Sequence, residues 1–282
     1  MKLSFSTYGW HDKNWEDFCE TAKDCGFSGI EVHNIHDPKL AEKNGIFDPV
    51  RANAAYRDMT EAGLTIPCID TWHNISDEEI FGICCSEIRD YIVTAKNLHI
   101  PYVRIGAKET GRGYEAERDT ALCVIEKMLP FAQESGVTLL VETIGPFSDT
   151  NKLCELLNNF ACDDLAALWD MQHTFRNAGE SPEDTVKNLG AYIKHVHLKD
   201  SFVIDGKNEY RLVTEGTLPI DAMMRSLYSL NYDGFISMEW SPEWMPEIED
   251  LMLIGMHFVN TVTRFGSPAR MVNSKRLSAN KR

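Results

Sequence analysis

The chain has 282 residues, of which 43% are apolar and 25% charged, so it can bury the core of a large soluble domain. Its formal net charge of −15 argues against a protein that grips nucleic acid through phosphate contacts, because such a protein needs a basic face. The longest apolar runs, such as 251–256, are too short to span a bilayer, and the first ten residues lack the apolar stretch of a signal peptide.

Strand-like segments recur along the chain, and each is followed by a helical pattern. The predicted strands span 3–8, 29–33, 64–70, 102–105, 137–142, 165–170, 193–198 and 235–240. The predicted helices span 15–28, 49–62, 77–98, 117–134, 151–160, 182–190, 219–230 and 246–264. Gly26, Gly63, Gly136 and Gly234 each stand just before a strand, where glycine commonly ends the preceding helix.

Eight strand–helix units in this length predict a single (β/α)8 TIM barrel over residues 1–266. The alternative is a doubly wound open sheet, but no G-x-G-x-x-G follows the first strand, and the chain has no G-x-x-x-x-G-K-[ST] phosphate loop. Residues 267–282 form a basic C-terminal tail with five Lys or Arg residues and no acid. We interpret this tail as a solvated terminus; the alternative is a tail that docks on an acidic neighbouring subunit.

The eight cysteines include no C-x-x-C pair and no Cys/His zinc-finger spacing. Most lie within helical patterns, where a free cysteine behaves as a small apolar residue. We therefore expect reduced thiols in a cytoplasmic protein, because disulfides are rare in that compartment.

The seventh predicted strand carries an unusual polar face. In YIKHVHLKD, residues 192–200, the alternation places two histidines and a lysine on one side together with an isoleucine: Ile193, His195, His197 and Lys199. His195 either hydrogen-bonds a carboxylate and orients nearby ligands, or fills a polar layer lower in the barrel, which is the simpler interpretation. His197 is expected to face the barrel mouth.

The last four strands each end on a potential metal ligand. These residues are Glu142, Asp170, His197 and Glu239. Since the active site of a TIM barrel lies at the C-terminal ends of its strands, the four side chains should converge. Three carboxylates and one imidazole suit one divalent ion, with Mn2+ the first choice and Mg2+, Co2+ or Zn2+ as alternatives.

The motifs LVET, WDMQH, HVHLKDS and SMEW resemble those of the xylose isomerase-like TIM barrels, the sugar phosphate isomerase/epimerase superfamily. That family includes ketose 3-epimerases, inosose isomerases and dehydratases, and endonuclease IV. The resemblance implies that Glu142 and Glu239 bind the metal and also act as the catalytic acid/base pair. It implies that Asp170 and His197 are the other two ligands, and that His173 contacts a substrate oxygen.

Several further residues are candidates for the substrate-binding set. Lys199, Lys108 and Arg104 could offset negative charge on an enediolate, as could Arg211 if its loop folds over the site. Arg104 is also a candidate for structural pairing inside the barrel. His73, at the end of the third strand, could line the pocket.

At two places the sequence differs from the motifs of particular branches of this family, and each difference argues against one function. The loop 202–207 lacks the D-x-H histidine that the three-zinc endonuclease IV branch requires, which argues against DNA repair. Ser148 stands where ketose 3-epimerases usually have a glutamate, which argues against a free ketohexose as substrate. YRLVTEGTLP and MEWSPEWMPEIED resemble a branch that contains the catalytic subunit of C-glycoside deglycosidases, which work with a small β-rich partner chain.

The sequence thus favours a metal-dependent isomerase or epimerase of a keto-sugar or inosose, acting by proton abstraction through an enediolate. The alternative is a lyase that uses the same site for β-elimination from a 3-oxo-sugar, or an inosose dehydratase. A non-catalytic metal-binding barrel is the third possibility. The expected partners are a small carbohydrate or polyol, and either a second copy of the chain or a small β-rich subunit.

Overall fold

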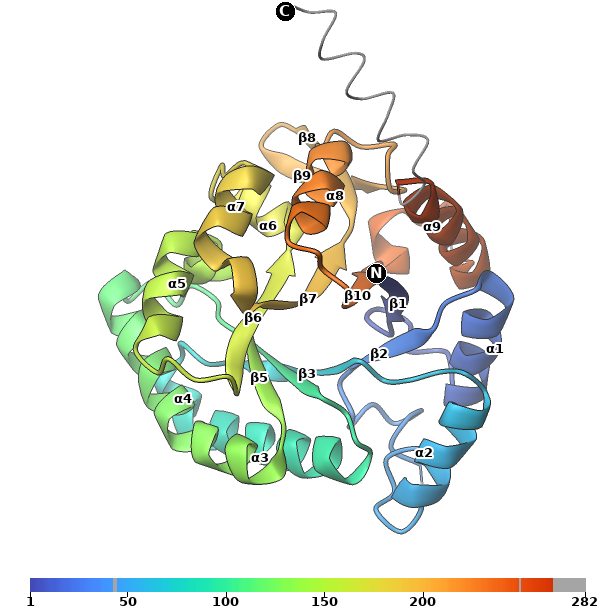
Figure 1. The fold of residues 1–282 in the computed structure, drawn as a ribbon, viewed down its shortest axis with the longest axis horizontal. Coiled ribbons are helices and arrows are strands. Elements are labelled where there is room, and N and C mark those ends of the chain that lie inside the picture. The colour runs from blue at the N-terminus through green and yellow to red at the C-terminus, as the bar shows by residue number, and fades with distance from the viewer. Residues whose placement is uncertain (43–44, 249, 266–282) are drawn as a thin grey trace, which may run out of the picture.

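A closed barrel of parallel strands forms the centre of the computed structural model, which describes residues 1–42, 45–248 and 250–265 (Figure 1). Around the barrel the strands follow the order β1-β10-β7-β6-β5-β4-β3-β2, so that neighbours in the chain are neighbours in space. Their bounds are Lys2–Ser6 (β1), Gly29–His33 (β2), Cys68–Asn74 (β3), Tyr102–Gly106 (β4), Thr138–Glu142 (β5), Leu165–Asp170 (β6), Ile193–Leu198 (β7) and Phe235–Met238 (β10). The predicted TIM barrel is confirmed.

The helices surround the barrel as an outer ring (Figure 1). They are α1 Trp15–Cys25, α2 Ala52–Glu61, α3 Phe81–Asn97, α4 Tyr114–Ser135, α5 Thr150–Asn158, α6 Met171–Arg176, α7 Pro182–Leu189, α8 Ile220–Ser229 and α9 Leu251–Phe265. Short 3-10 turns lie at Glu78–Ile80 (η1), Gly145–Phe147 (η2), Gly190–Tyr192 (η3) and Pro242–Trp244 (η4). None of the helices in the described ranges is long and apolar enough to cross a membrane.

Alternation along the strands divides the buried side chains into two sets. The outward-facing residues, such as Val141, Trp169 and Val196, join the large apolar core between strands and helices. Leu140 and Leu168 belong to a small separate cluster inside the barrel. Above that apolar layer the interior is polar, which leaves the mouth of the barrel free for charged groups.

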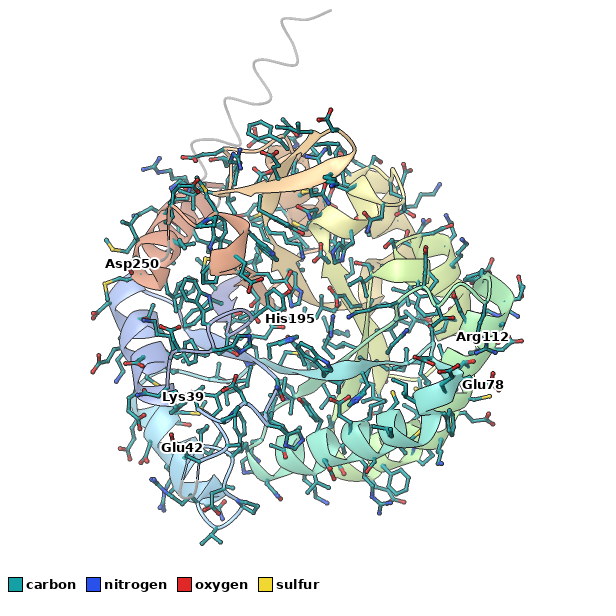
Figure 2. The ribbon with its side chains drawn as sticks, turned by 180° about the vertical axis from the view of Figure 1, so that it is seen from behind. Lys39, Glu42, Glu78, Arg112, His195 and Asp250 are labelled. Atoms are coloured by element: carbon teal, nitrogen blue, oxygen red, sulfur yellow. The ribbon has the colours of Figure 1, made fainter. Side chains whose placement is uncertain are left out.

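One face assignment in β7 was wrong. Ile193, predicted on the histidine face, packs in the outer core. The register with β6 shifts between Ala167 and Leu168, which pair with Ile193 and His195, so β7 holds one extra residue there. Such a bulge reverses the alternation at that point, so His195, His197 and, after the strand, Lys199 face inward while Ile193 does not. His195 lies near the centre of the barrel (Figure 2).

Several boundaries also differ from the prediction. The third strand begins at Cys68 and not at residue 64, because Pro67 cannot donate to a ladder and Thr65 makes only an isolated bridge to Gly29. Residues 200–211 form an antiparallel hairpin, β8 Asp200–Ile204 and β9 Lys207–Arg211, where a loop was expected. The tail and its boundary at residue 267 lie outside the described residues and stay a prediction.

All eight cysteines lie in the described part of the chain and are free. This agrees with the expected thiols. Burial raises the pKa of Cys25 to about 11 and that of Cys84 to about 12, so both thiols stay protonated and unreactive at neutral pH.

The turn after β5 depends on a glycine beside the barrel mouth. Gly145 has φ +57°, and a Cβ there would lie 2.5 Å from the carbonyl oxygen of Ala107. We expect Gly145→Ala to lower the free energy of unfolding by about 2 kcal/mol, because left-handed strain and backbone overlap both oppose the methyl group. Gly82→Ala is the control, since Gly82 lies in α3 with no heavy atom within 4 Å of its added Cβ. Urea unfolding of both variants tests this, and equal stabilities would contradict it.

Candidate metal centre and active site

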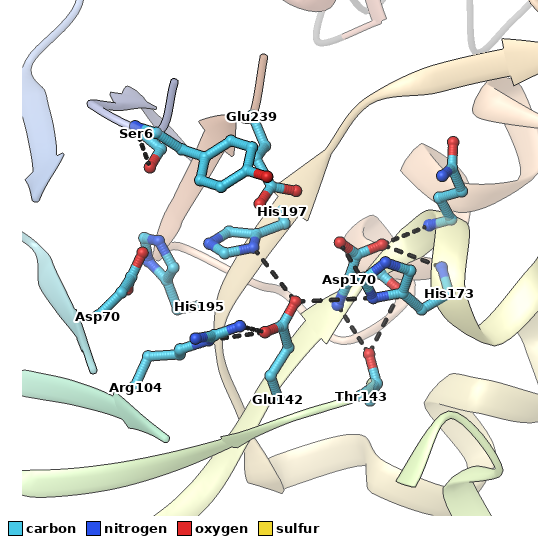
Figure 3. A network of polar contacts seen from close by, with 12 residues as sticks. Ser6, Asp70, Arg104, Glu142, Thr143, Asp170, His173, His195, His197 and Glu239 are labelled. Atoms are coloured by element: carbon cyan, nitrogen blue, oxygen red, sulfur yellow. Dashed lines mark hydrogen bonds and ion pairs between the residues drawn. The ribbon is translucent and has the colours of Figure 1, made fainter. Parts of the chain in front are cut away.

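Three of the four predicted metal ligands meet at the barrel mouth. Glu142 and Asp170 are the last residues of β5 and β6, and the strand register places His197 beside Asp170. One ligand atom from each lies within 4.8 Å of the others, and all three side chains are buried. Nδ1 of His197 lies 3.6 Å from Oε1 of Glu142 and has no hydrogen-bond partner (Figure 3). A buried nitrogen without a partner among carboxylates fits the donor set of a divalent cation.

The fourth predicted ligand, Glu239, reaches this group through a lysine. Glu239 follows β10, and its carboxylate pairs with Nζ of Lys199. The same ammonium lies 2.5 Å from Oδ2 of Asp170. Burial lowers the pKa of Lys199, but the charges of Asp170 and Glu239 outweigh burial and raise it above the ordinary value. Lys199 therefore carries a full positive charge between the two carboxylates.

Arg104 neutralises the third carboxylate. Its Nε lies 2.6 Å from Oε2 of Glu142, and a second nitrogen of the guanidinium contacts the same oxygen (Figure 3). The remaining nitrogen donates to the carbonyl of Thr71 at 3.0 Å. Although burial raises the pKa of Glu142, the charge of Arg104 and the contacts with His197 hold it well below its usual range. Glu142 is consequently ionised.

His173 enters the site through a short helix that the sequence analysis did not predict. Asp170 caps α6 by accepting hydrogen bonds from the backbone N–H groups of Gln172 and His173, at 2.9 and 3.0 Å. This cap turns the His173 ring back, so that its Nδ1 lies 3.4 Å from Oδ2 of Asp170 and 3.6 Å from Oε1 of Glu142. Burial lowers the pKa of His173, which favours the neutral imidazole.

A cavity of about 220 Å³ opens above these groups. His173, Lys199, His73 and Lys108, which the sequence proposed for substrate binding, all line it. His73 is held by Glu87, 2.9 Å from its Nδ1. The cavity has room for a small sugar-sized molecule, with charged groups at its floor and at one side.

Arg211, also proposed for substrate binding, points elsewhere. It ends β9, and its guanidinium lies 3.1 Å from Oε2 of Glu209 and over the ring of Phe202. Among the described residues Arg211 is not part of the cavity wall, whereas the adjacent Tyr210 is. The hairpin does reach the mouth, but it presents an aromatic ring there and not a cation.

Aromatic rings form the other side of the mouth. Tyr210 stacks on Trp244 with ring centroids 3.8 Å apart, and Tyr8 contacts both Trp244 and His33. Trp72 is 57% exposed at the rim of the same cavity. The cavity therefore has a charged side and an aromatic side.

Glu31 is a buried residue of this region that the sequence analysis missed. It lies in the middle of β2 with no exposed surface, and its carboxylate contacts Nε2 of His195 at 2.9 Å and Nε2 of His197 at 2.6 Å. Burial raises its pKa, but the charges of His197 and His195 bring it well below the usual value. The alternation of GIEVH carried a signal, because apolar Ile30 and Val32 on the outer side place Glu31 inside.

Glu31 also takes part in two other groups whose ligand atoms lie within 4.8 Å of one another. One consists of Glu31, His195 and His197, and the other of Glu31, Cys68 and Asp70. Burial and the negative charge of Glu31 raise the pKa of Asp70 to about 6. The interior beneath the mouth is thus rich in groups whose charges depend on one another.

Comparison with known proteins places the chain among barrels of this architecture. The model of the family described as "Xylose isomerase-like TIM barrel" matches residues 19–261. The chain belongs to the xylose isomerase-like TIM barrel family. This confirms the resemblance inferred from the sequence, and the family match extends from α1 into α9.

Relatives of this xylose isomerase-like barrel include sugar epimerases. Fructoselysine 3-epimerase of Shigella flexneri is 24% identical over 265 residues, which cover 88% of this chain and 92% of that protein. Among solved structures, a D-tagatose 3-epimerase-like protein has a TM-score of 0.75 at 18% identity, covering 98% of this chain and 99% of the other. The IOLI protein, solved with a bound zinc atom, has a TM-score of 0.76 at 18% identity, covering 94% and 96%. At these identities the structural matches establish the fold.

Proposed function

We propose that this barrel is a divalent-metal-dependent isomerase or epimerase of a keto-sugar or inosose. The observation that carries the proposal is the convergence of Glu142, Asp170 and His197 at the mouth, with an unpartnered His197 Nδ1 among the carboxylates. A relative that is a fructoselysine 3-epimerase supports the choice of a keto-sugar. We expect Glu239 to complete the ligand set once its pairing with Lys199 is exchanged for the ion.

The donor types favour a hard or borderline ion. Three carboxylates and one imidazole suit Mn2+ first, with Mg2+, Co2+ and Zn2+ as alternatives. When bound, such an ion acts as a Lewis acid that stabilises negative charge developing on a substrate oxygen.

The reaction requires one proton to leave a carbon between a carbonyl and a hydroxyl group, and one proton to return. We assign these roles to Glu142 and Glu239: one carboxylate accepts the proton and the other, protonated, donates to the opposite face or to the adjacent carbon. Arg104 favours the ionised form of Glu142, which is the form that can accept a proton. Lys199 supplies positive charge beside the developing enediolate, and neutral His173 can donate or accept a hydrogen bond at a substrate oxygen.

Metal content is the first test. Protein purified without chelator should hold one equivalent of a divalent ion by elemental analysis. The variant His197→Ala should lose the ion, because the substitution removes the only nitrogen among the proposed ligands. His36→Ala, at an exposed histidine, is the matched control and should keep the ion. Three equivalents of zinc would instead favour the endonuclease IV alternative, and no ion even after soaking with Mn2+ would overturn the proposal.

Solvent exchange tests the chemistry. Keto-sugars, inososes, fructoselysine and 3-oxo-glycosides incubated with the protein in deuterated buffer should gain deuterium next to the carbonyl, and chelation should stop the exchange. Exchange with epimerisation or isomerisation supports the proposal. Exchange with release of water or an aglycone would replace it by the lyase alternative, and no exchange with any of these compounds would count against both.

The oligomeric state of the protein and the identity of any partner subunit stay predictions. A second copy or a small β-rich subunit is expected, and the mass of the complex purified from its source cells tests this. The cytoplasmic location is likewise an expectation, which fractionation tests.

A further inference from the structure

Glu31 joins two imidazoles from the opposite side of the barrel. Its Oε1 contacts His197 and its Oε2 contacts His195, so each oxygen serves one ring. The two rings lie edge to face, with centroids 5.7 Å apart and planes at 83°. All three residues are at most 1% exposed, so water does not compete for these contacts.

The chemistry of the contact fixes where the hydrogen atoms lie. An ionised carboxylate can only accept hydrogen bonds, so Nε2 of each histidine must carry its proton and donate it to Glu31. In the metal-bound form, in which the ring has released its second proton, this leaves the lone pair of His197 on Nδ1, the nitrogen that faces Glu142 and has no hydrogen-bond partner. A histidine that ligates a metal characteristically donates its other N–H to such an acceptor.

A metal ion between Glu31 and the histidines does not fit these distances. Nitrogen and oxygen ligands of one tetrahedral zinc would lie about 3.3 Å apart, given zinc–ligand distances near 2.0 Å. The observed separations of 2.6 and 2.9 Å are those of direct, charge-assisted hydrogen bonds. Glu31 therefore acts on the rings and not through an ion of its own.

We propose that Glu31 is a positioning residue that holds His197 in the Nε2–H tautomer, with Nδ1 directed at the metal position between Glu142 and Asp170. The proposal rests on the proposed metal site. His195 occupies the second oxygen of Glu31, and the first oxygen alone serves His197.

The test is zinc affinity together with the histidine tautomers. Glu31→Gln keeps the shape of the side chain, but its amide oxygen can accept from one ring only, and in either orientation His197 loses its ionised acceptor. We expect isothermal titration to give a zinc Kd raised about 10- to 100-fold in the variant. In the zinc-loaded wild type, ¹⁵N spectra of labelled histidines should show His197 with Nε2 protonated and Nδ1 bound to the ion.

Two further variants separate positioning from simple packing. His195→Gln removes the second ring but leaves the contact between Glu31 and His197, so its zinc Kd should stay close to wild type even if its free energy of unfolding falls. Glu31→Asp keeps the charge on a shorter side chain that cannot reach both rings, so its zinc affinity should lie between those of wild type and Glu31→Gln. If Glu31→Gln does not fold, Glu31→Asp takes its place in the affinity measurement.

The outcomes distinguish this proposal from the metal site itself. Wild-type zinc affinity in Glu31→Gln, equal losses of affinity in Glu31→Gln and His195→Gln, or a second zinc equivalent bound by Glu31 would each overturn the positioning role and leave the proposed function standing. Failure of the wild type to bind any zinc or manganese would overturn both.

Discussion

Glu142→Gln and Glu239→Gln are each expected to lower the rate of deuterium exchange into substrate by at least about 10³-fold, because the amide can neither accept nor return the proton. Both residues are assigned to the same proton-transfer pair, so either change should stop the cycle. The rate is measured at saturating Mn2+, which compensates for weaker metal binding by the variants.

The exchange measurement needs a control variant and a test that each variant is folded. Glu134→Gln, at an exposed position of α4, makes the same chemical change away from the mouth and should exchange at the wild-type rate. Glu142→Gln also weakens the ionic contact of the partly buried Arg104, so circular dichroism must show that the variant is folded. Near-normal exchange by either folded variant would make the two-base mechanism wrong.

The residues at the ends of successive barrel strands were predictable from sequence, because the strand–helix unit repeats along the chain. Each of the last four barrel strands carries one potential ligand at its C-terminal end or within one residue of it, and parallel strands bring such ends to one face. Glu142, Asp170 and His197 meet there because their positions follow from strand periodicity and register alone. The glycine before the last strand shows the limit of local signals: Gly234 does not have a left-handed φ, and the ring of Tyr232 packs against it instead.

Contacts across the barrel could not be predicted in the same way. Glu31 and His197 are 166 residues apart in the chain, and their contact depends on barrel closure and on the rotamer of each side chain. The bridge from Lys199 to both Asp170 and Glu239 likewise depends on side-chain packing that no local pattern encodes. Sequence therefore identified the cation and both carboxylates, but not the contacts between them.

The hairpin at the mouth was not predicted, although the sequence contains a recognisable turn signal for it. Asp205 and Gly206, with φ +49° and +74°, form the two-residue turn between Ile204 and Lys207. Asp-Gly is a preferred pair for such turns, since both residues must adopt positive φ. A loop interpretation of this segment placed Arg211 over the site, whereas the strand geometry presents Tyr210 there.

Lys199→Met should strongly destabilise protein stripped of metal, by about 3–5 kcal/mol in the free energy of unfolding, because it leaves the buried Asp170 and the partly buried Glu239 without their cation. Asp170 is fully buried, and Lys199 is 4% exposed, so solvent cannot compensate. Lys152→Met is the matched control: its partner Asp149 lies 3.7 Å away on the surface, and the expected loss is about 0.5 kcal/mol or less.

The loss should also depend on pH. In the wild type, burial raises the pKa of Asp170, but His173 and Lys199 outweigh it and lower the pKa below the ordinary value of 3.8. The stability gained from this shift is complete above that ordinary pKa and is lost as the pH falls through the lower folded value. Without Lys199 burial should dominate, so the folded variant takes up a proton more readily than the unfolded chain and recovers stability as the pH falls.

Denaturant unfolding of chelator-treated protein at pH 8 and pH 5 tests this directly. The difference between wild type and Lys199→Met should be larger at pH 8, and equal differences at both values would contradict the electrostatic explanation. Saturating Mn2+ at pH 8 should then reduce the difference, because an ion that binds only the folded state supplies the positive charge that the variant lacks. A deficit that Mn2+ leaves unchanged would mean that the ion and the ammonium do not act on the same carboxylates, and would count against Glu239 and Asp170 as joint ligands.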